Sequence, residues 1–398
     1  MHGRRRRSAL VVVLMLGLAA ALALSASSRG GTDGTRLGDA HAGTAAGGFG
    51  EVYKASPKTL AKTLFSAKLL PANAMARNIS LAAYRRANIK VNQTLALKCW
   101  KNNGCSTGTG GKLTVAYVEG FGENVYRQVS KMEFILQALT DFRAAISQHV
   151  SAIVTYPDFG DAMIPVFKEA TKAGIPVSTY AWGFVSGPGS NYTTVVGEDT
   201  CKLGKAFARV MNTQVKSGDI GFLGGFPGNP LSLGWQKCEQ PALNPNIHVV
   251  ANEPTNWDPS KVQGIVSGIL AQHPNIKGWS YEDAEFMAEG GYAAYKAAGL
   301  PYNTVLTMRT DETALGCLYS KLKNPNLKVY YYTAGNSQIR VALTADMMKL
   351  RGAKIPPKIV FPIQLQNMAN RNTCVKGYPP SGSATSLVPL SLLRRMYP

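Results

Sequence analysis

Acidic, cationic and aromatic side chains follow the apolar runs in the second half of this 398-residue chain. They are Trp257, Glu282, Asp283, Arg309 and Asp311. Carboxylates accept strong, charge-assisted hydrogen bonds from hydroxyl groups, and flat aromatic rings cover the apolar faces of a small molecule. These residue types predict a binding site for a small polyhydroxylated, sugar-like compound. The same carboxylates and rings would also bind an amine, so this alternative stays open.

A second group of candidate binding residues lies in the first half of the chain. Its members are Glu119, Phe121, Asn124, Tyr156, Asp158 and Trp182. Tyr156 and Asp158 follow the apolar run 151–155, and Trp182 follows the run 175–180. If these runs are neighbouring parallel strands, their carboxyl ends lie at the edge of the sheet where ligands gather. We therefore expect both groups to face one site.

Residues 149–182 spell one complete strand-helix-strand unit. Apolar, β-branched runs at 151–155 and 175–180 flank a helical pattern at 161–173. Two buried strands joined by a helix of about a dozen residues are parallel neighbours with a right-handed crossover. The unit therefore predicts an open α/β sheet.

The same alternation of strands and helices continues along the chain. Further strands are expected at 113–118, 219–223, 248–252, 278–281, 304–308, 328–332 and 357–363. Further helices are expected at 200–212, 230–243, 259–273, 284–298, 312–323 and 338–350. These strands are too many for one compact sheet, so we expect an α/β fold of two doubly wound, parallel-sheet (Rossmann-like) lobes. The chain should change lobes near Gly197 and return near 333–338 and 353–357.

The amino-terminal residues have the features of an export signal. Residues 1–28 combine the basic stretch Arg4–Arg7 with an uncharged apolar run and small residues at its end, which predicts an exported, extracytoplasmic protein of the periplasm or cell envelope. The apolar run also leaves an uncleaved membrane anchor open. Residues 29–49 are rich in Gly, Ala and Thr and predict a flexible linker, and residues 50–111 predict a helical extension.

Composition argues against several functional classes. The formal net charge is +20, but Lys and Arg are scattered outside the leader, so no nucleic-acid partner is expected. The five histidines show no metal-ligand spacing, and there is no G-x-S-x-G motif of a nucleophilic serine. We expect no metal, no cofactor and no enzymatic activity.

Six cysteines in an exported chain predict disulfides. Fifteen connectivities are possible. The preferred arrangement, with Cys99–Cys105 chosen for its proximity, is Cys99–Cys105, Cys201–Cys238 and Cys317–Cys374. Some of these cysteines could instead be buried free thiols.

The order of several segments resembles a known family. The segments are KLTVAYVEGFGENVYRQ, SAIVTYPDFGDAMIPVFKEATKAGIPVSTYAW, VVGEDTCKLGK, DIGFLGGFPGN, TNWDPSK and YYTAGNSQIRVAL. Residues 112–365 thereby resemble type I periplasmic binding proteins of the ribose-binding kind, the solute receptors of ABC importers. The resemblance implies two lobes that close on a ligand about a three-segment hinge, and an ABC transporter permease as partner. It implies a first lobe of 112–196 plus 335–355 and a second of 197–334 plus 356–398.

The resemblance also assigns roles to some residues. Trp257 matches the family's ring-stacking aromatic, and Phe121 lies in the loop that supplies the aromatics of the first lobe. Glu282 and Asp283 fall at an Asn-Asp position. Ring faces and acceptors at these positions suit a sugar.

At other positions the chain departs from the family. Ala181 and Trp182 stand where the family has Asp and Arg, and Tyr156 stands for an Asn. Arg309 falls where an Asp is common, and a salt bridge across the hinge would equally explain Arg309 with Asp311. A cell-wall hydrolase and a cytosolic transcription regulator of the same fold remain as alternatives of other classes.

Overall fold

The described part of the chain begins at the end of the expected helical extension. The computed structural model describes residues 92–102, 105, 114–118, 125–141, 151–157, 160–181, 185–332, 336, 338–350, 352–361, 363–386 and 388–396. The predicted export signal, linker and most of the extension lie outside these residues, as do the candidates Glu119, Phe121, Asn124, Asp158 and Trp182. Within the described ranges, no helix is both long and apolar enough to cross a membrane.

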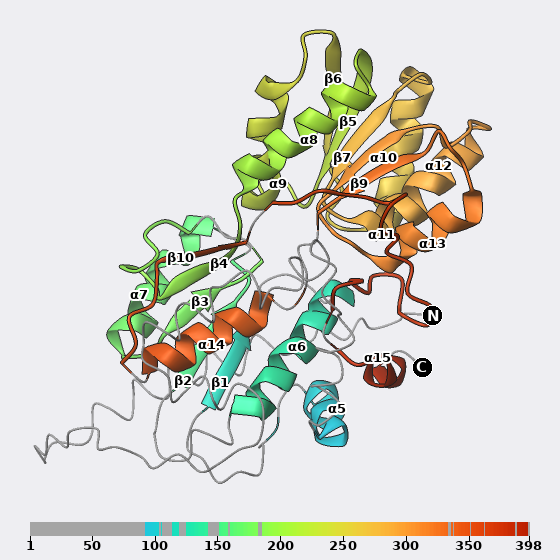
Figure 1. Ribbon diagram of the computed structural model, residues 1–398. Helices are drawn as coiled ribbons and strands as arrows, with labels where there is room; N and C mark the ends of the chain where they lie inside the picture. The colour runs from blue at the N-terminus through green and yellow to red at the C-terminus, as the bar shows by residue number, and fades with distance from the viewer. Residues whose placement is uncertain are drawn as a thin grey trace, which may run out of the picture.

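Two separate sheets form the centres of two lobes (Figure 1). In the described residues, the parallel strands of the first sheet are ordered β1 (Thr114–Val118), β2 (Ser151–Thr155), β3 (Val177–Thr179), β4 (Thr194–Glu198) and β10 (Lys358–Phe361). The second sheet is ordered β11 (Gln366–Asn367), β9 (Lys328–Tyr331), β8 (Val305–Met308), β7 (Gly278–Tyr281), β5 (Gly218–Gly224) and β6 (Ile247–Pro254). Strand β11 is antiparallel to β9, and the other pairs are parallel. The predicted α/β fold of two parallel-sheet lobes is confirmed.

Helices cover both sheets. Those of the first lobe are α5 (Gln93–Lys101), α6 (Val125–Asp141), η4 (Gly160–Met163), α7 (Ile164–Lys172), α14 (Gln338–Leu350) and α15 (Leu390–Met396). Those of the second are α8 (Thr200–Gln214), α9 (Pro230–Glu239), η5 (Gln240–Ala242), α10 (Pro259–Gln272), α11 (Ala284–Phe286), η6 (Met287–Gly291), α12 (Tyr292–Ala297) and α13 (Thr313–Leu322). The single helix expected at 284–298 contains the π-helical turn η6. A Cβ at Gly290 would lie 2.4 Å from the Pro259 carbonyl oxygen, so this glycine lets η6 approach α10.

Side-chain caps fix where three helices of the second lobe begin. Asp199, Asn229 and Asp258 precede α8, α9 and α10, and their side chains accept hydrogen bonds of 2.9 to 3.2 Å from N–H groups of the first turn. Pro230 and Pro259 occupy the first turns of α9 and α10, where no intrahelical N–H bond is lost. The caps therefore position the loops that precede α9 and α10 at the carboxyl edge of the second sheet.

In the described part of the fold, three chain crossings join the two sheets: after β4, between β9 and α14, and between β10 and β11. The expectation that residues 356–398 belong to the second lobe is wrong for β10, because this strand pairs with β4 from Lys358 to Phe361. Ile359 and Phe361 alternate with exposed positions and face the core of the first lobe. The third crossing therefore lies after Phe361 and not near Pro356.

The last residues of the chain also return to the first lobe. Leu392, Leu393 and Met396 of α15 belong to the buried cluster that includes Ala96 and Leu97 of α5. Sequence reasoning missed α15 because its seven residues are too few to show a helical period clearly. The three preferred disulfides, Cys99–Cys105, Cys201–Cys238 and Cys317–Cys374, are confirmed.

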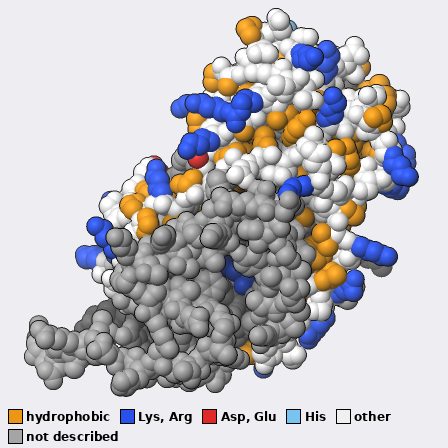
Figure 2. Space-filling model, viewed as in Figure 1, with side chains coloured by type: hydrophobic (Ala, Val, Ile, Leu, Met, Phe, Trp, Pro, Cys, Tyr) orange, Lys and Arg blue, Asp and Glu red, His pale blue; other side chains and the backbone are white. Residues whose placement is uncertain are grey.

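Acidic and basic side chains are distributed unequally between interior and surface. Among the described residues, nine carboxylates are buried, against three guanidinium groups. The buried carboxylates are Glu133, Glu198, Glu239, Glu282, Asp283, Glu285, Asp311, Glu312 and Asp346. Figure 2 accordingly shows many Lys and Arg side chains and little Asp or Glu on the described part of one face. In the described part of the chain, the positive charge is therefore concentrated on the exterior.

Candidate functional site

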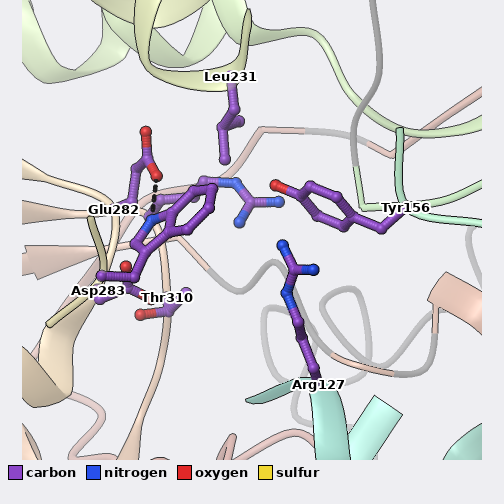
Figure 3. Close-up of a pocket in the computed structure, with 8 residues that line it drawn as sticks. Arg127, Tyr156, Leu231, Glu282, Asp283 and Thr310 are labelled. Carbon is purple, nitrogen blue, oxygen red and sulfur yellow. Dashed lines mark hydrogen bonds between the residues drawn. The ribbon is translucent and has the colours of Figure 1, made fainter. Parts of the chain in front are cut away.

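A small pocket lies between the two lobes at the carboxyl ends of their strands (Figure 3). Arg127 and Tyr156 line it from the first lobe. The second lobe contributes Leu231, Trp257, Glu282, Asp283, Arg309 and Thr310. The cavity volume is about 30 Å³, which is room for one or two water molecules. The structure thus brings together five of the predicted site residues: Tyr156, Trp257, Glu282, Asp283 and Arg309.

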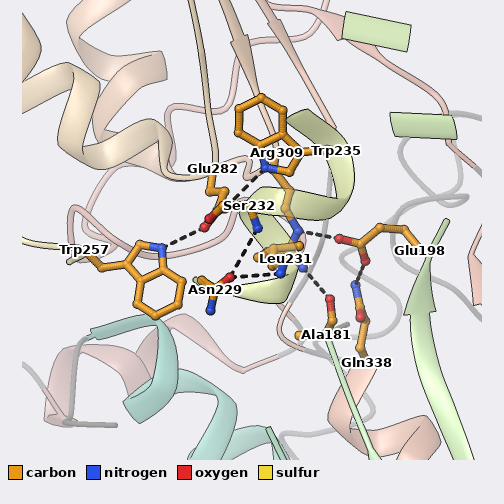
Figure 4. A network of polar contacts seen from close by, with 10 residues as sticks. All are labelled: Ala181, Glu198, Asn229, Leu231, Ser232, Trp235, Trp257, Glu282, Arg309 and Gln338. Carbon is orange, nitrogen blue, oxygen red and sulfur yellow. Dashed lines mark hydrogen bonds and ion pairs between the residues drawn. The ribbon is translucent and has the colours of Figure 1, made fainter. Parts of the chain in front are cut away.

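Glu282 holds the ring of Trp257 in place (Figure 4). Its Oε2 accepts a hydrogen bond from Trp257 Nε1 at 2.8 Å, and its Oε1 accepts bonds from Ser232 Oγ and, at 3.3 Å, from Trp235 Nε1. Burial raises the pKa of this carboxyl, and the bond from Ser232 partly offsets the rise. Both oxygens of Glu282 therefore have partners within the protein, and the residue orients the pocket's main aromatic ring.

Trp257 stands in an unusual backbone conformation. Its φ is 51°, in the left-handed region, and the preceding Asn256 has φ 55°. The ring makes an edge contact with Phe226 at 5.4 Å between centroids. A Cβ at Gly225 would lie 2.4 Å from Trp257 Cζ2. The ring therefore lies directly against the backbone of Gly225, and the local strain is typical of a binding site.

Asp283 supplies an acceptor to the pocket. Its Oδ2 is buried and has no hydrogen-bond partner among the described residues. Burial raises the pKa of this carboxyl well above its usual value, the charge of Glu282 raises it further, and Arg309 and Arg127 lower it. A buried oxygen without a protein partner is costly unless a ligand or water satisfies it.

Arg127 is a pocket residue that sequence reasoning missed. Its guanidinium carbon lies 4.7 Å from the ring centroid of Tyr156 and 5.7 Å from that of Trp257. It comes from the first turn of α6, just after the carboxyl end of β1. A cationic residue at the start of the helix that follows the first strand was the signal that could have identified it.

Arg309 joins the two lobes beside the pocket (Figure 4). Its Nε pairs with Glu198 at the end of β4, and its Nη2 donates to the Ala181 carbonyl at 2.5 Å. Gln338 Nε2 also donates to Glu198, at 3.4 Å. Arg309 thus forms an ion pair between the lobes, but its partner is Glu198, and the expected pairing of Arg309 with Asp311 is wrong.

Asp311 lies away from the pocket lining. Its Oδ1 accepts from Ser383 Oγ at 2.6 Å, and its Oδ2 accepts from the N–H and Oγ1 of Thr385 at 3.0 and 2.7 Å. Burial raises the pKa of Asp311, while these bonds lower it. The structure therefore gives Asp311 a structural role, in contact with the carboxyl-terminal segment.

The described pocket is suited to binding. Its lining offers rings, an acceptor and donors, and it contains neither His nor Cys. In the part of the chain that the structure describes, no group of three His, Cys, Asp or Glu side chains could hold a metal ion. The described lining thus lacks the nucleophile-base pairs through which His and Cys act in hydrolases.

Comparisons with known proteins agree with this architecture. An ABC transporter periplasmic solute binding protein from Actinobacillus succinogenes with bound D-allose is 20% identical, with a TM-score of 0.53 over 63% of this chain and 96% of that chain. A glucose-galactose binding protein from Geobacillus stearothermophilus is 16% identical, with a TM-score of 0.55 over 66% and 99%. The periplasmic component of an arabinose ABC transporter from Shewanella is 18% identical, with a TM-score of 0.56 over 64% and 92%.

Sequence comparison gives the family itself. A search of curated proteins finds no significant match. A protein-family model described as a periplasmic binding protein domain matches residues 137–354, which is more than half of the chain. The protein therefore belongs to the family of periplasmic binding protein domains.

Proposed function

We propose that the protein is an exported solute receptor of an ABC importer, and that it holds a small sugar-like compound between its lobes. The observation that carries this proposal is the Trp257 ring, which Glu282 fixes beside the Asp283 carboxyl, whose Oδ2 has no hydrogen-bond partner among the described residues. The ring offers a flat apolar face for the C–H groups of a sugar. Similar folds whose descriptions name D-allose, arabinose and glucose-galactose support the same ligand class.

The polar groups around the ring divide into acceptors and donors. Asp283 can accept from a ligand hydroxyl, and the Arg127 guanidinium and the Tyr156 hydroxyl, which line the same pocket, can donate. Sugar hydroxyls both donate and accept, so they match this mixture. A cationic amine would gain from Asp283 but would lie close to two guanidinium groups, Arg127 and Arg309. The described lining therefore favours a neutral polyol over an amine.

Entry of such a ligand requires movement. The described cavity, of about 30 Å³, is far smaller than a typical ligand pocket of roughly 300 Å³ or more. Arg309 crosses from the second lobe to Glu198 and Ala181 of the first. We infer that the lobes separate about their three crossings to admit the ligand, as in hinge closure of two-domain receptors.

The decisive experiment is a thermal-shift screen with D-allose, L-arabinose, D-galactose, polyols, amines and amino acids. A ligand at a hundredfold its dissociation constant adds about 2.7 kcal/mol to the free energy of unfolding. We expect one or more sugars to raise the melting temperature and Trp257→Ala to abolish the shift. Tyr319→Ala, a half-buried aromatic of α13 outside the pocket lining, is the matched control and should keep the shift. A shift by amines alone would reject the sugar proposal.

Export and the transporter are separate parts of the proposal. The basic and apolar residues 1–28 support export, either as a cleaved signal or as a membrane anchor. We propose an ABC transporter permease as the partner and no chemical turnover of the ligand. A reporter fused to the leader should leave the cytoplasm, and a reporter that stays there would favour the regulator alternative. Turnover of glycosides or peptidoglycan by the purified protein would favour the hydrolase.

A further inference from the structure

The carboxyl-terminal segment, residues 373–386 and 388–396, is attached firmly to the second lobe. Cys374 is disulfide-bonded to Cys317 of α13. Ser381 Oγ donates to Glu285 of α11, and Ser383 and Thr385 bind the buried carboxylate of Asp311. One covalent bond and several buried hydrogen bonds therefore join this segment to the carboxyl edge of the second sheet.

The same segment is attached to the first lobe by noncovalent contacts. Ser386 Oγ donates to Glu133 Oε1 of α6 at 2.9 Å. Leu392 and Leu393 of α15 are fully buried in the core cluster that also contains residues of α5 and α6. Figure 1 shows α15 beside α5, while the crossing strands β4 and β10 lie at the other side of the first lobe. We call this segment the C-terminal bridge.

One stripe of α6 connects this bridge to the pocket. Arg127, Ser130 and Glu133 follow each other at intervals of three residues, and all three are buried. Arg127 lines the pocket, Ser130 Oγ accepts from Asn336 Nδ2 at 3.0 Å in the second crossing, and Glu133 accepts from Ser386 of the bridge. Arg340 of α14 also pairs with Glu133. The helix therefore contacts the pocket, a crossing segment and the bridge through one face.

We propose that the C-terminal bridge is a clasp that holds the lobes together, and that its docking on α6 is coupled to the state of the interlobe pocket. The clasp is a link in addition to the three crossings. Its second-lobe end is covalent and its first-lobe end is noncovalent, so we expect lobe opening to loosen the first-lobe end, where Ser386 and α15 contact α6 and α5. The coupling to the pocket rests on the proposed function, whereas the clasp itself does not.

The coupling has a definite physical form. Lobe separation moves the second lobe, together with the bridge, relative to α6. Arg127 and Glu133 are on one helix, so a displacement of α6 that begins at the pocket also moves Glu133 relative to Ser386 of the bridge. Coupling between two sites is reciprocal, and a change at the pocket must therefore affect the docking of α15 as much as the reverse.

The first test loosens the bridge and uses hydrogen exchange in the full-length protein without any ligand. Leu393→Asp places a charge in the buried face of α15, and Ser217→Asp, which places the same charge on the exposed surface of the second lobe, is the control. We expect Leu393→Asp to speed amide exchange in α15, α5 and α6 by about tenfold relative to Ser217→Asp, with α13 unchanged. Equal exchange of α6 in the two variants would overturn the clasp.

A milder variant covers the case in which Leu393→Asp does not fold. Ser386→Ala removes the hydroxyl that donates to Glu133 and accepts from the Val388 N–H, and Ser217→Ala, at an exposed position of the second lobe, is its control. The Ser386→Ala protein should show a several-fold faster exchange in α6 and α15. Exchange in Ser386→Ala that equals exchange in Ser217→Ala would contradict the clasp as well.

The coupling is tested from the pocket end. Arg127→Met removes the guanidinium from the pocket and keeps the length of the side chain. We expect faster amide exchange in α15. For this effect, residue 127 does not itself have to contact α15. Unchanged exchange in α15 would overturn the coupling but leave the clasp. If no sugar shifts the melting temperature but the variants still show these exchange effects, the proposed function is wrong and the clasp stands.

Discussion

At the scale of single residues, some side chains of the pocket hold other side chains in place, and different ones are available to contact the ligand. Glu282 was expected to bind the ligand, but its two oxygens already accept from Trp257, Ser232 and Trp235. Polar contacts with the ligand therefore fall to other side chains that line the cavity, chiefly to the carboxyl of Asp283. A carboxylate can thus be essential to a binding site through the ring that it orients, because the ring's position decides which face the ligand meets.

The first prediction concerns the backbone beneath Trp257. In Gly225→Ala, the new Cβ would lie 2.4 Å from the ring, so the indole must shift out of its position. We expect the sugar-induced thermal shift to be lost while the protein remains folded. Gly264→Ala is the control, because nothing lies within 4 Å of a Cβ there. It sits within α10, where alanine stabilises a helix by up to about 1 kcal/mol relative to glycine. An unchanged shift in Gly225→Ala would mean that the ring does not contact the ligand.

The second prediction concerns the charge of Asp283. Its pKa is raised in the folded protein, so its contribution to the free energy of unfolding falls as pH rises from its unfolded pKa, about 3.9, toward its folded pKa. Asp283→Asn removes this cost and should raise the melting temperature at neutral pH. The same variant should bind sugar more weakly, since the amide is a poorer acceptor. Melting curves over pH with and without sugar measure both effects, and sugar binding equal to wild type would remove Asp283 from the recognition set.

At the scale of elements, the regular strand-helix units were readable from the sequence. Strand β7 begins and ends as predicted at 278–281, and α14 as predicted at 338–350. Apolar runs of four to six residues between glycines and prolines specify buried parallel strands clearly. Strand β4 was missed because its TVVGE sequence follows a Gly-rich stretch and contains a glycine itself. The lobe of β10 could not be predicted, because an apolar run fits either sheet until its neighbour is known.

The site was predictable to a similar extent. Residues directly after strands, such as Tyr156 and Asp283, were found because strand ends mark the ligand edge of an α/β sheet. Arg127 was missed because it lies within a helix, where a charged residue normally faces solvent. Asp311 was misplaced because its partners, Ser383 and Thr385, are more than seventy residues away, and no local pattern indicates such a contact.

The third prediction concerns α11 and its contact with the C-terminal bridge. Burial raises the pKa of Glu285 to about 7, and the bond from Ser381 partly opposes the rise. The folded state thus binds the proton more tightly than the unfolded state. The contribution of Glu285 to the free energy of unfolding is fully present below the pKa of the unfolded state, about 4.3, and is lost as pH rises through about 7. Glu285→Gln should flatten the decline of the melting temperature over this range.

The matched control for this prediction lies on the next turn. Glu289 is exposed, so Glu289→Gln should leave most of the pH dependence in place. Chemical denaturation at several pH values between 4 and 8 gives the free energy of unfolding of each variant. Equal slopes for wild type and Glu285→Gln would show that the carboxyl titrates as an ordinary surface group.

At the scale of the whole molecule, the fourth prediction is a change of shape. A cavity of about 30 Å³, small for a ligand pocket, lies between two sheets joined by three crossings, and this favours an open form that admits the ligand. Small-angle scattering should give a smaller radius of gyration with a saturating sugar identified by the thermal-shift screen than without it. The Trp257→Ala protein, measured with the same sugar, is the control and should show no change. Superimposable curves for the wild-type protein would contradict closure.

The two lobes also differ in how they are assembled along the chain. Residues 200–331 supply nearly all of the second lobe as one continuous stretch, whereas the first lobe combines α5, β1 and α6 with α14, β10 and α15 from the far end. Contacts between distant residues form slowly, because a long loop must close before they contribute. The second lobe can therefore fold as soon as it has been synthesised. The first lobe must wait for the last residues of the chain, so truncation near the carboxyl terminus would leave half of the pocket without a finished scaffold.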